Sequence, residues 1–238
     1  MKFEKVKYLN KQFEINNNNW LEDLNNSNKY HFNIKKWRWD IIISAPHSVN
    51  HEREWETLNA DLLTWWLTLY LSEKYNLPCI YSTSYLVWDP NYDDIENCLY
   101  KEKLSEYIKE NNINFLIDLH WCWSERNFAI ELWTWWWNHP NLQWNEKLLN
   151  IIKWSLNDSL GSYLLHTWRE ITINTIFPAS YENTISKFIF TKNHIPTIQL
   201  EINYELRNPM DEDKITKLIT ALENLIEELE KFFKNKVL

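Results

Sequence analysis

The sequence predicts an α/β fold, a three-layer α/β/α sandwich built on a mixed, mainly parallel sheet. Short apolar runs rich in β-branched residues alternate with longer amphipathic stretches from residue 40 onward, which is typical of strands alternating with helices. Runs such as FLI at 115–117 are apolar throughout, as expected of strands buried on both faces. Neither an internal repeat nor a Pro-, Ser- or Gly-rich linker divides the chain. We therefore expect a single domain over 37–238 after a loosely ordered lead-in over 1–36.

Each element follows from its local pattern. Apolar, β-branched runs predict strands at 41–45, 79–85, 114–119, 128–132, 163–166, 187–191 and 197–202. Amphipathic spacing predicts helices at 58–75, 100–111, 145–156, 181–185 and 211–234. The last helix begins with three acidic residues, which complement the positive end of the helix dipole. Its apolar residues recur every three or four positions, so one face packs, against the core or against another subunit.

Composition and charge exclude several classes of protein. With 45% hydrophobic and 24% charged residues, the chain is neither disordered nor fibrous. Its net charge of −8 gives no basic surface for a nucleic acid. Three widely spaced cysteines form neither a disulfide framework nor a CxxC site, which suits a reducing compartment. The N-terminus lacks the apolar stretch of a signal peptide and no run of 18 apolar residues occurs, so we expect a cytoplasmic protein without a membrane partner.

The glycine and tryptophan counts are abnormal, at 1 and 16. A glycine content of about 7% would give roughly 17 glycines at this length. Several tryptophans stand where glycine is expected, such as Trp121 and Trp123 after an apolar strand, Trp88 before Asp-Pro, and 135–137 before Asn-His-Pro. We hypothesise that most of them are UGA codons, which some bacterial codes read as glycine, translated as tryptophan. The alternative is a genuine Trp-rich surface on which sugars or other flat ligands stack.

The strand predicted at 41–45 is followed by a dense group of ionisable side chains. In open α/β sheets, ligands bind beyond the carboxyl ends of the strands. Imidazole and carboxylate groups are common zinc ligands, so this segment is a candidate metal site, with a charged surface loop as the alternative. The residues concerned are His47, His51, Glu52, Arg53 and Glu54.

Two further strand ends carry residues suited to catalysis. Asp118 and His120 face the same side of their strand, so His120 could bind a metal while Asp118 orients it. Glu201 interrupts a buried strand, where an unpaired carboxylate would be costly, so it must be paired, metal-bound or catalytic. Arg126, which lies beyond His120, could bind a substrate anion. Together these residues offer metal ligands, a carboxylate for proton transfer and a cation for the substrate, which are the groups that metal-assisted hydrolysis requires.

The motifs at these three strand ends resemble the N-formylglutamate amidohydrolase family. They are Ser-Ala-Pro-His at 44–47 with Arg-Glu-Trp at 53–55, Asp-Leu-His-Trp at 118–121 with Arg126, and Gln-Leu-Glu-Ile-Asn at 199–203 with Arg207. The resemblance covers residues 40–210 and improves when Trp55, Trp65, Trp121, Trp133 and Trp135 are read as glycine. The family belongs to a wider zinc carboxypeptidase-like group that includes aspartoacylases and poly-γ-glutamate hydrolases. The resemblance therefore implies a phosphorylase/hydrolase-like fold.

The resemblance also implies roles for individual residues. It makes His47 and His120 zinc ligands, Glu201 the general acid/base, and Arg126 the group that binds a substrate carboxylate or a developing oxyanion. We expect further substrate contacts from Arg53, Arg169 and Asn203.

The third metal ligand is the point at which the sequence departs from the wider group. That group commonly has His-x-x-Glu, whereas position 50 here is asparagine, whose amide oxygen is a poor zinc ligand. The third ligand is then Glu54, His51 or the more distant Asp61, and we select Glu54.

The predicted function is that of a zinc-dependent amidohydrolase. It would cleave an amide bond next to a carboxylate in a small anionic amide or peptide, such as an N-formyl or N-acyl amino acid. Poly-γ-glutamate or peptide hydrolysis on the same fold is an alternative. A metal-free binding pseudoenzyme is another, if the third ligand has been lost.

Overall fold

The computed structural model describes residues 32–36, 40–94, 98–135, 139–176, 183–208 and 210–235. Within them, the main sheet contains β1 (Phe32–Lys35), β2 (Ile41–Ala45), β5 (Cys79–Ser82), β6 (Phe115–Cys122), β7 (Phe128–Trp133), β8 (Glu170–Ile173) and β9 (Thr197–Asn203). Their spatial order is β1-β5-β2-β6-β9-β7-β8. A separate hairpin is formed by β3 (His51–Arg53) and β4 (Glu56–Leu58).

The sheet is mixed and mainly parallel, as predicted. Strands β5, β2, β6 and β9 run parallel to one another, and β8 runs parallel to β7. Only the β1–β5 and β7–β9 pairs of this sheet are antiparallel. Because β2, β6 and β9 are adjacent and parallel, their carboxyl ends lie at one edge of the sheet, where sequence analysis expects the site.

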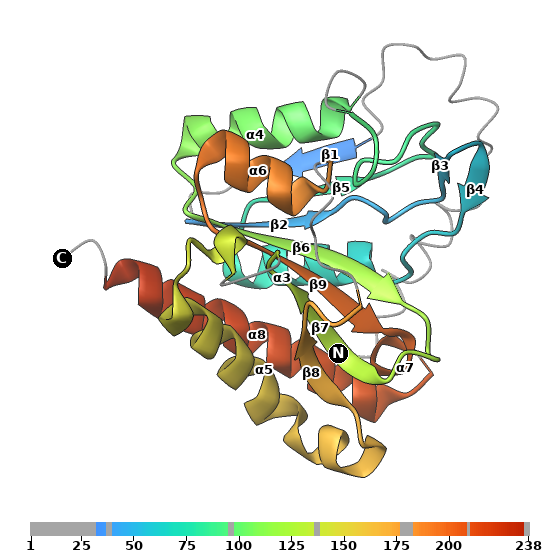
Figure 1. Ribbon diagram of the computed structural model, residues 1–238, viewed down its shortest axis with the longest axis vertical. Helices are drawn as coiled ribbons and strands as arrows, with labels where there is room; N and C mark the ends of the chain where they lie inside the picture. The colour runs from blue at the N-terminus through green and yellow to red at the C-terminus, as the bar shows by residue number, and fades with distance from the viewer. Residues whose placement is uncertain are drawn as a thin grey trace.

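Helices cover both faces of the sheet (Figure 1). Their bounds are α3 Thr64–Tyr75, α4 Leu99–Asn111, η2 Pro140–Leu142, α5 Glu146–Thr167, α6 Ile185–Asn193, α7 Tyr204–Arg207 and α8 Glu212–Lys234. Helices α4 and α6 pack on one face, and α3, α5 and α8 lie on the other. Ile42 and Leu116 belong to the core beneath α4 and α6, whereas Ile41, Ile43 and Ile117 belong to the opposite core. The apolar strands are therefore buried on both faces, which confirms the three-layer fold.

The apolar face of α8 packs inside the molecule. Its buried residues, from Ile215 to Phe233, join the same core as those of α5, which lies beside it (Figure 1). This observation favours the core interpretation of the stripe over a subunit contact. Among the described residues, every helix is too short or too polar to cross a membrane.

Two segments predicted as strands are helical. Residues 163–166 form the end of α5, because the buried positions of this helix recur every three or four residues through Tyr163. Residues 187–191 lie in α6, which begins after Thr184, whose side chain accepts a hydrogen bond from the Lys187 backbone N–H. Apolar runs of four or five residues do not distinguish strand from helix by periodicity alone. The predicted helix at 181–185 falls partly outside the described residues, and Ile185 begins α6.

Strand β8 was not predicted, and β1 lies in the segment expected to be a loosely ordered lead-in with at most one strand or helical turn. Strand β1 pairs with β5 and lies within the predicted lead-in, so the sheet begins before residue 37; residues 1–31 lie outside the described part. Strand β8 follows α5 directly, and β7 pairs with it on the side away from β9.

Four tryptophans occupy backbone conformations that favour glycine. Trp55, Trp135, Trp144 and Trp168 have φ values between 55° and 70°. Glu54 and Trp55 form the two-residue turn between β3 and β4 with φ of 51° and 70°, as in type I′ turns, which favour glycine at the second position. Trp168 is the left-handed cap of α5 and is 93% exposed, at a position where glycine is usual. These positions agree with the codon hypothesis, which stays a prediction.

Other tryptophans bear on the hypothesis differently. The tight turn expected at Trp121 does not occur, because β6 continues to Cys122 and Trp121 pairs in register with Ile202 of β9. The indole Nε1 atoms of Trp66 and Trp121 are nevertheless buried without a hydrogen-bond partner. Buried indole N–H groups usually find an acceptor, so these two side chains fit their surroundings poorly. The positions 136–137 lie outside the described residues.

Candidate metal centre

The parallel strands bring three predicted residues to one edge of the sheet. His47 follows β2 in a loop that two serines hold in place: Ser48 Oγ donates to Ser82 O at 2.7 Å, and Ser82 Oγ donates to Pro46 O at 2.6 Å. His120 lies near the end of β6 and faces Glu201 of β9 in register. All three of these side chains are buried, at 8% exposure or less.

A fourth residue, Asp61, lies between the two histidines. Its backbone N–H donates to His47 O at 2.7 Å, and it stands three residues before α3. Asp61 Oδ2 is buried and lies 3.6 Å from His47 Nδ1 and 3.4 Å from His120 Nδ1. Ligand atoms about 2.0–2.2 Å from a tetrahedral zinc ion lie roughly 3.3–3.6 Å apart. Both distances to Asp61 Oδ2 fit a shared metal ion, and His47, Asp61 and His120 each offer a ligand atom within 4.8 Å of the other two.

The second nitrogen of each histidine is held by another carboxylate. His47 Nε2 lies 2.7 Å from Asp89 Oδ1, and His120 Nε2 lies 3.0 Å from Asp118 Oδ2. In metal sites, a carboxylate that accepts from the distal ring nitrogen fixes the tautomer and turns the other nitrogen toward the metal. Both histidines thus present Nδ1 toward Asp61. The prediction that Asp118 orients His120 agrees with this geometry.

Asp89 belongs to a separate network of charged groups. Arg53 donates to Asp89 Oδ2 from Nε and approaches it from Nη2, both at 2.6 Å, while the Asn91 backbone N–H donates to Oδ1. His51 Nε2 is 3.5 Å from Asp89 Oδ2, and the His51 ring stacks on that of His47. A second possible metal-binding group, His47, His51 and Asp89, therefore uses a carboxylate that an arginine and the backbone already satisfy. The group with Asp61 is the better site.

Burial and charge together set the protonation of this cluster. Burial lowers the pKa of His47, but the carboxylates of Asp89 and Asp61 outweigh it and raise the pKa to about 9. His120 follows the same balance, with its pKa raised well above the usual range by Asp118 and Asp61. Burial raises the pKa of Asp61, yet hydrogen-bonding and charge from the two histidines lower it overall. The metal-free site is thus a compact group of buried, oppositely charged side chains.

Glu201 is the carboxylate best suited to proton transfer. Its Oε1 accepts a hydrogen bond from Gln199 Nε2 at 3.0 Å. Burial raises its pKa to about 7, against the opposing effect of the charge on His120. A carboxyl group with a pKa near neutrality is suited to accept and return a proton.

The remaining predicted site residues lie around the cluster rather than in it. Glu54 is exposed in the β3–β4 turn and accepts a hydrogen bond from Tyr92 Oη, so the structure does not bring it to the histidines. Arg53 is bound to Asp89, as described above. Arg169 donates to Ser124 O at 2.7 Å and to Glu205 Oε1 at 3.1 Å.

Two predicted residues lie at the turn that joins β6 to β7. Arg126 is partly buried there. Asn203 Nδ2 donates to the carbonyl oxygens of Trp123, Arg126 and Phe128, so Asn203 holds this turn against the end of β9. Its side chain Oδ1 also accepts from the Glu205 backbone N–H at the start of α7.

Asn50, at the position where the wider group has glutamate, has a structural role. Its Oδ1 accepts a hydrogen bond from the Ala60 backbone N–H at 2.8 Å, directly before Asp61. Asn50 therefore fixes the segment that carries Asp61. Sequence reasoning kept Asp61 only as a distant candidate, because 14 positions separate it from His47 and no local pattern marks it.

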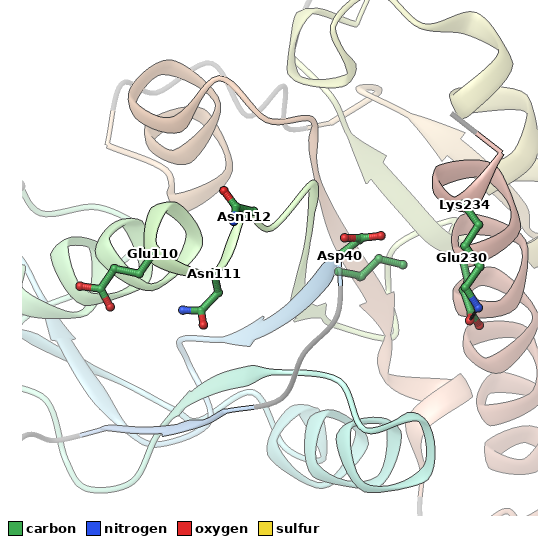
Figure 2. A pocket seen from close by; sticks show the side chains of 7 residues that line it. Asp40, Glu110, Asn111, Asn112, Glu230 and Lys234 are labelled. Atoms are coloured by element: carbon green, nitrogen blue, oxygen red, sulfur yellow. Dashed lines mark hydrogen bonds and ion pairs between the residues drawn. The ribbon is translucent and has the colours of Figure 1, made fainter. Parts of the chain in front are cut away.

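A cavity of about 600 Å³ lies elsewhere, at the opposite edge of the sheet. It is lined by Asp40 and Ile41 at the start of β2, by 110–112 at the end of α4, and by Glu230 and Lys234 of α8 (Figure 2). It contains no histidine or cysteine and is remote from the histidine cluster by the length of β2. It is therefore not the candidate active site.

Comparisons with known proteins identify the fold. No protein-family profile matches the sequence, and no curated protein matches it either. Among solved structures, the gene product Atu2144 from Agrobacterium tumefaciens is similar, with a TM-score of 0.55 and 14% identity over 86% of this chain and 96% of that chain. N-formylglutamate amidohydrolase from Ralstonia eutropha JMP134 gives a TM-score of 0.54 and 10% identity over 83% and 96%. A bacteriophage poly-gamma-glutamate hydrolase gives 0.50 and 14% over 90% and 96%. At these identities the likeness establishes the fold that the resemblance implied.

Proposed function

We propose that this protein is a zinc-dependent amidohydrolase that cleaves an amide bond next to a carboxylate. The observation that carries the proposal is the position of Asp61 Oδ2, 3.6 Å and 3.4 Å from the Nδ1 atoms of His47 and His120. This buried oxygen lies between two imidazoles whose distal nitrogens are held by other carboxylates, at distances that suit ligands of one metal ion.

The three residues supply the ligands of a catalytic zinc site. Two histidines and one carboxylate are a usual set for zinc hydrolases, and they leave a fourth position for water or substrate. Asp61 takes the place that we had assigned to Glu54. Zinc held there would polarise the amide carbonyl and lower the pKa of a bound water molecule to about 7.

Glu201 performs the proton transfers in this proposal. It faces His120 across the β6–β9 pair and is buried. Its carboxylate accepts a proton from the attacking water and returns it to the leaving nitrogen, so that the C–N bond breaks to give a carboxylic acid and a free amine.

The substrate class follows from the fold neighbours and from the charge around the site. Two of the similar structures are named for N-formylglutamate and poly-gamma-glutamate, both of which have an amide close to a carboxylate. Arg126 stays our candidate for the substrate carboxylate, because it lies at the turn beyond His120 and is partly buried. We favour an N-formyl or N-acyl amino acid, and a γ-glutamyl peptide is the second candidate.

The test combines metal analysis with hydrolysis assays. We expect about one zinc ion per chain, release of glutamate from N-formylglutamate or N-acetylglutamate, and loss of both metal and activity in His120→Ala. A folded protein that takes up no zinc during titration would overturn the proposal and favour a metal-free binding protein.

A further inference from the structure

Glu131, in the middle of β7, is a buried carboxylate that the proposed mechanism does not use. It is fully buried and lies opposite Glu201 in the antiparallel β7–β9 pair, while Glu201 lies beside His120 in the β6–β9 pair. Residues that lie opposite each other in adjacent strands project from the same face of the sheet. Glu131 therefore continues the row formed by His120 and Glu201, on the side of Glu201 away from His120.

The Glu131 carboxylate holds two residues that follow β8. Its Oε1 accepts hydrogen bonds from the backbone N–H of Thr175 at 2.6 Å and from that of Ile176 at 2.8 Å. The same oxygen also accepts a hydrogen bond from the Thr175 hydroxyl. Hydrogen bonds to a carboxylate are stronger than those between neutral groups. Glu131 thus fixes the backbone of Thr175 and Ile176 against β7.

Asn174 turns the chain toward Glu131. It has a φ of 50°, a left-handed conformation that asparagine tolerates. Its Oδ1 accepts a hydrogen bond from the Thr134 backbone N–H at 2.9 Å, and its Nδ2 donates to Thr134 Oγ1 at 3.0 Å and to Trp135 O at 2.9 Å. Asn174 and Glu131 together anchor the segment 174–176 to β7 and to the residues that directly follow β7.

The side chain of Ile176 is exposed, although its backbone is bound to a buried group. Ile176 is 39% exposed, whereas Glu131 is 0% exposed. In the proposed reaction, Glu201 returns a proton to the leaving nitrogen, so the released amine lies next to Glu201. Because Glu131 is the next residue of the row, Ile176 is held at the position toward which the rest of the leaving amine would extend.

We propose that Ile176 contacts the side-chain methylenes of the amino acid that is released, and that Glu131 is the positioning residue that holds Ile176 there. This inference rests on the proposed function and deepens it. It makes the released amino acid the part of the substrate that is selected by the length of its side chain. Glutamate, with two side-chain methylenes, fits such a contact, whereas glycine has none.

The experiment compares Ile176→Ala and Glu131→Gln with the unaltered protein, all loaded with zinc. Leu165→Ala and Glu170→Gln are the matched controls, since they make the same kinds of change at exposed positions of α5 and β8. The constants kcat and KM are measured with N-formylglutamate and with N-formylglycine. Dissociation constants for glutamate and glycine are measured by calorimetry. Melting temperature and zinc content establish that each variant is folded and loaded.

We expect Ile176→Ala to raise KM for N-formylglutamate by about 10-fold, the size of effect that an apolar contact with a substrate methylene produces, with kcat changed less than about 2-fold. Both constants for N-formylglycine should stay unchanged. Glutamate should bind about 10-fold more weakly, and Glu131→Gln should act in the same direction. If Glu131→Gln does not fold, Ile176→Ala still decides the inference, because Ile176 is exposed.

Three outcomes would overturn the inference. An equal rise of KM for both substrates would mean that the segment has only a structural role. A lower kcat with an unchanged KM would place the effect on Glu201 instead of on the leaving group. Unchanged constants for N-formylglutamate in Ile176→Ala would remove the contact altogether.

Failure of the proposed function is visible separately, as absence of turnover in the unaltered zinc-loaded protein. The dissociation constants then still test the role of Ile176, because they do not require turnover. Glutamate bound equally by Ile176→Ala and by the unaltered protein, or by neither, would overturn the inference.

Discussion

Asp61 Oδ2 lies 3.4 Å from His120 Nδ1, although the two residues are 59 positions apart and belong to different elements. The loop before α3 carries Asp61, whereas His120 lies in β6. Parallel pairing of β2 with β6 places the loop after β2, and with it His47, beside the end of β6. The hydrogen bond from Asp61 N to His47 O then holds Asp61 next to both histidines. The candidate centre is therefore assembled by the topology of the sheet rather than by a local motif.

Asp61→Asn is expected to abolish zinc binding, because an amide oxygen is a poor zinc ligand and the charge of the site is reduced. Glu54→Gln is the matched variant: it removes the carboxylate of an exposed residue outside the cluster, and we expect zinc content to remain at about one per chain. Metal analysis after dialysis, with circular dichroism to verify folding, makes the comparison. If Glu54→Gln loses zinc and Asp61→Asn keeps it, the third zinc ligand is Glu54 rather than Asp61.

Asp118→Asn should weaken zinc binding without abolishing it. Asp118 contacts the distal nitrogen of His120 at 3.0 Å, and removal of such a partner typically costs about 10-fold to 100-fold in metal affinity. A chelator competition assay measures the affinity. An unchanged affinity would mean that the ring of His120 is oriented by its packing alone.

The stability of the zinc-free protein should decrease as pH rises from 6 to 9. His47 has a pKa of about 9 in the folded protein against an ordinary value of 6.5, so its contribution is present below 6.5 and is lost through 9. Glu201 acts in the same direction, with a contribution present below about 4.5 and lost through about 7. Zinc should reverse the trend, since binding displaces protons and strengthens as pH rises.

Urea unfolding at pH 6, 7.5 and 9 in the presence of EDTA, or of zinc, measures this dependence. We expect the two series to diverge toward high pH, the zinc series becoming the more stable. Parallel curves would show that the buried histidines do not exchange protons for the metal.

Sequence patterns predict the strands of the sheet well where an apolar run is followed by ionisable side chains. The strands that carry His120 and Glu201, and the one that precedes His47, were predicted from such runs. Their common edge follows from parallel pairing. Asp61 could not be selected in this way, because its position depends on how the loop held by Asn50 folds back onto His47.

The errors in secondary structure have a similar origin. The runs at 163–166 and 187–191 were assigned to strands on local composition, whereas their helical state depends on the pattern of the preceding residues and on the cap at Thr184. Strand β1 has only four residues and depends on pairing with β5, which no local pattern shows.

Trp154 within α5 and Trp168 at its C-terminal cap provide a direct test of the codon hypothesis. Trp168→Gly should stabilise the protein by about 1 kcal/mol, because a non-glycine residue in the left-handed region carries a cost of roughly that size and the side chain is 93% exposed. Trp154→Gly should destabilise it by about 0.5–1 kcal/mol, since Trp154 is exposed within the same helix, where glycine is unfavourable. Thermal and urea unfolding compare the two variants. If both substitutions destabilise the protein equally, the backbone at Trp168 gives no preference for glycine.

The intact mass of the protein from its native host then shows whether tryptophan or glycine stands at these positions. Tryptophan at 55, 135, 144 and 168 would contradict the hypothesis.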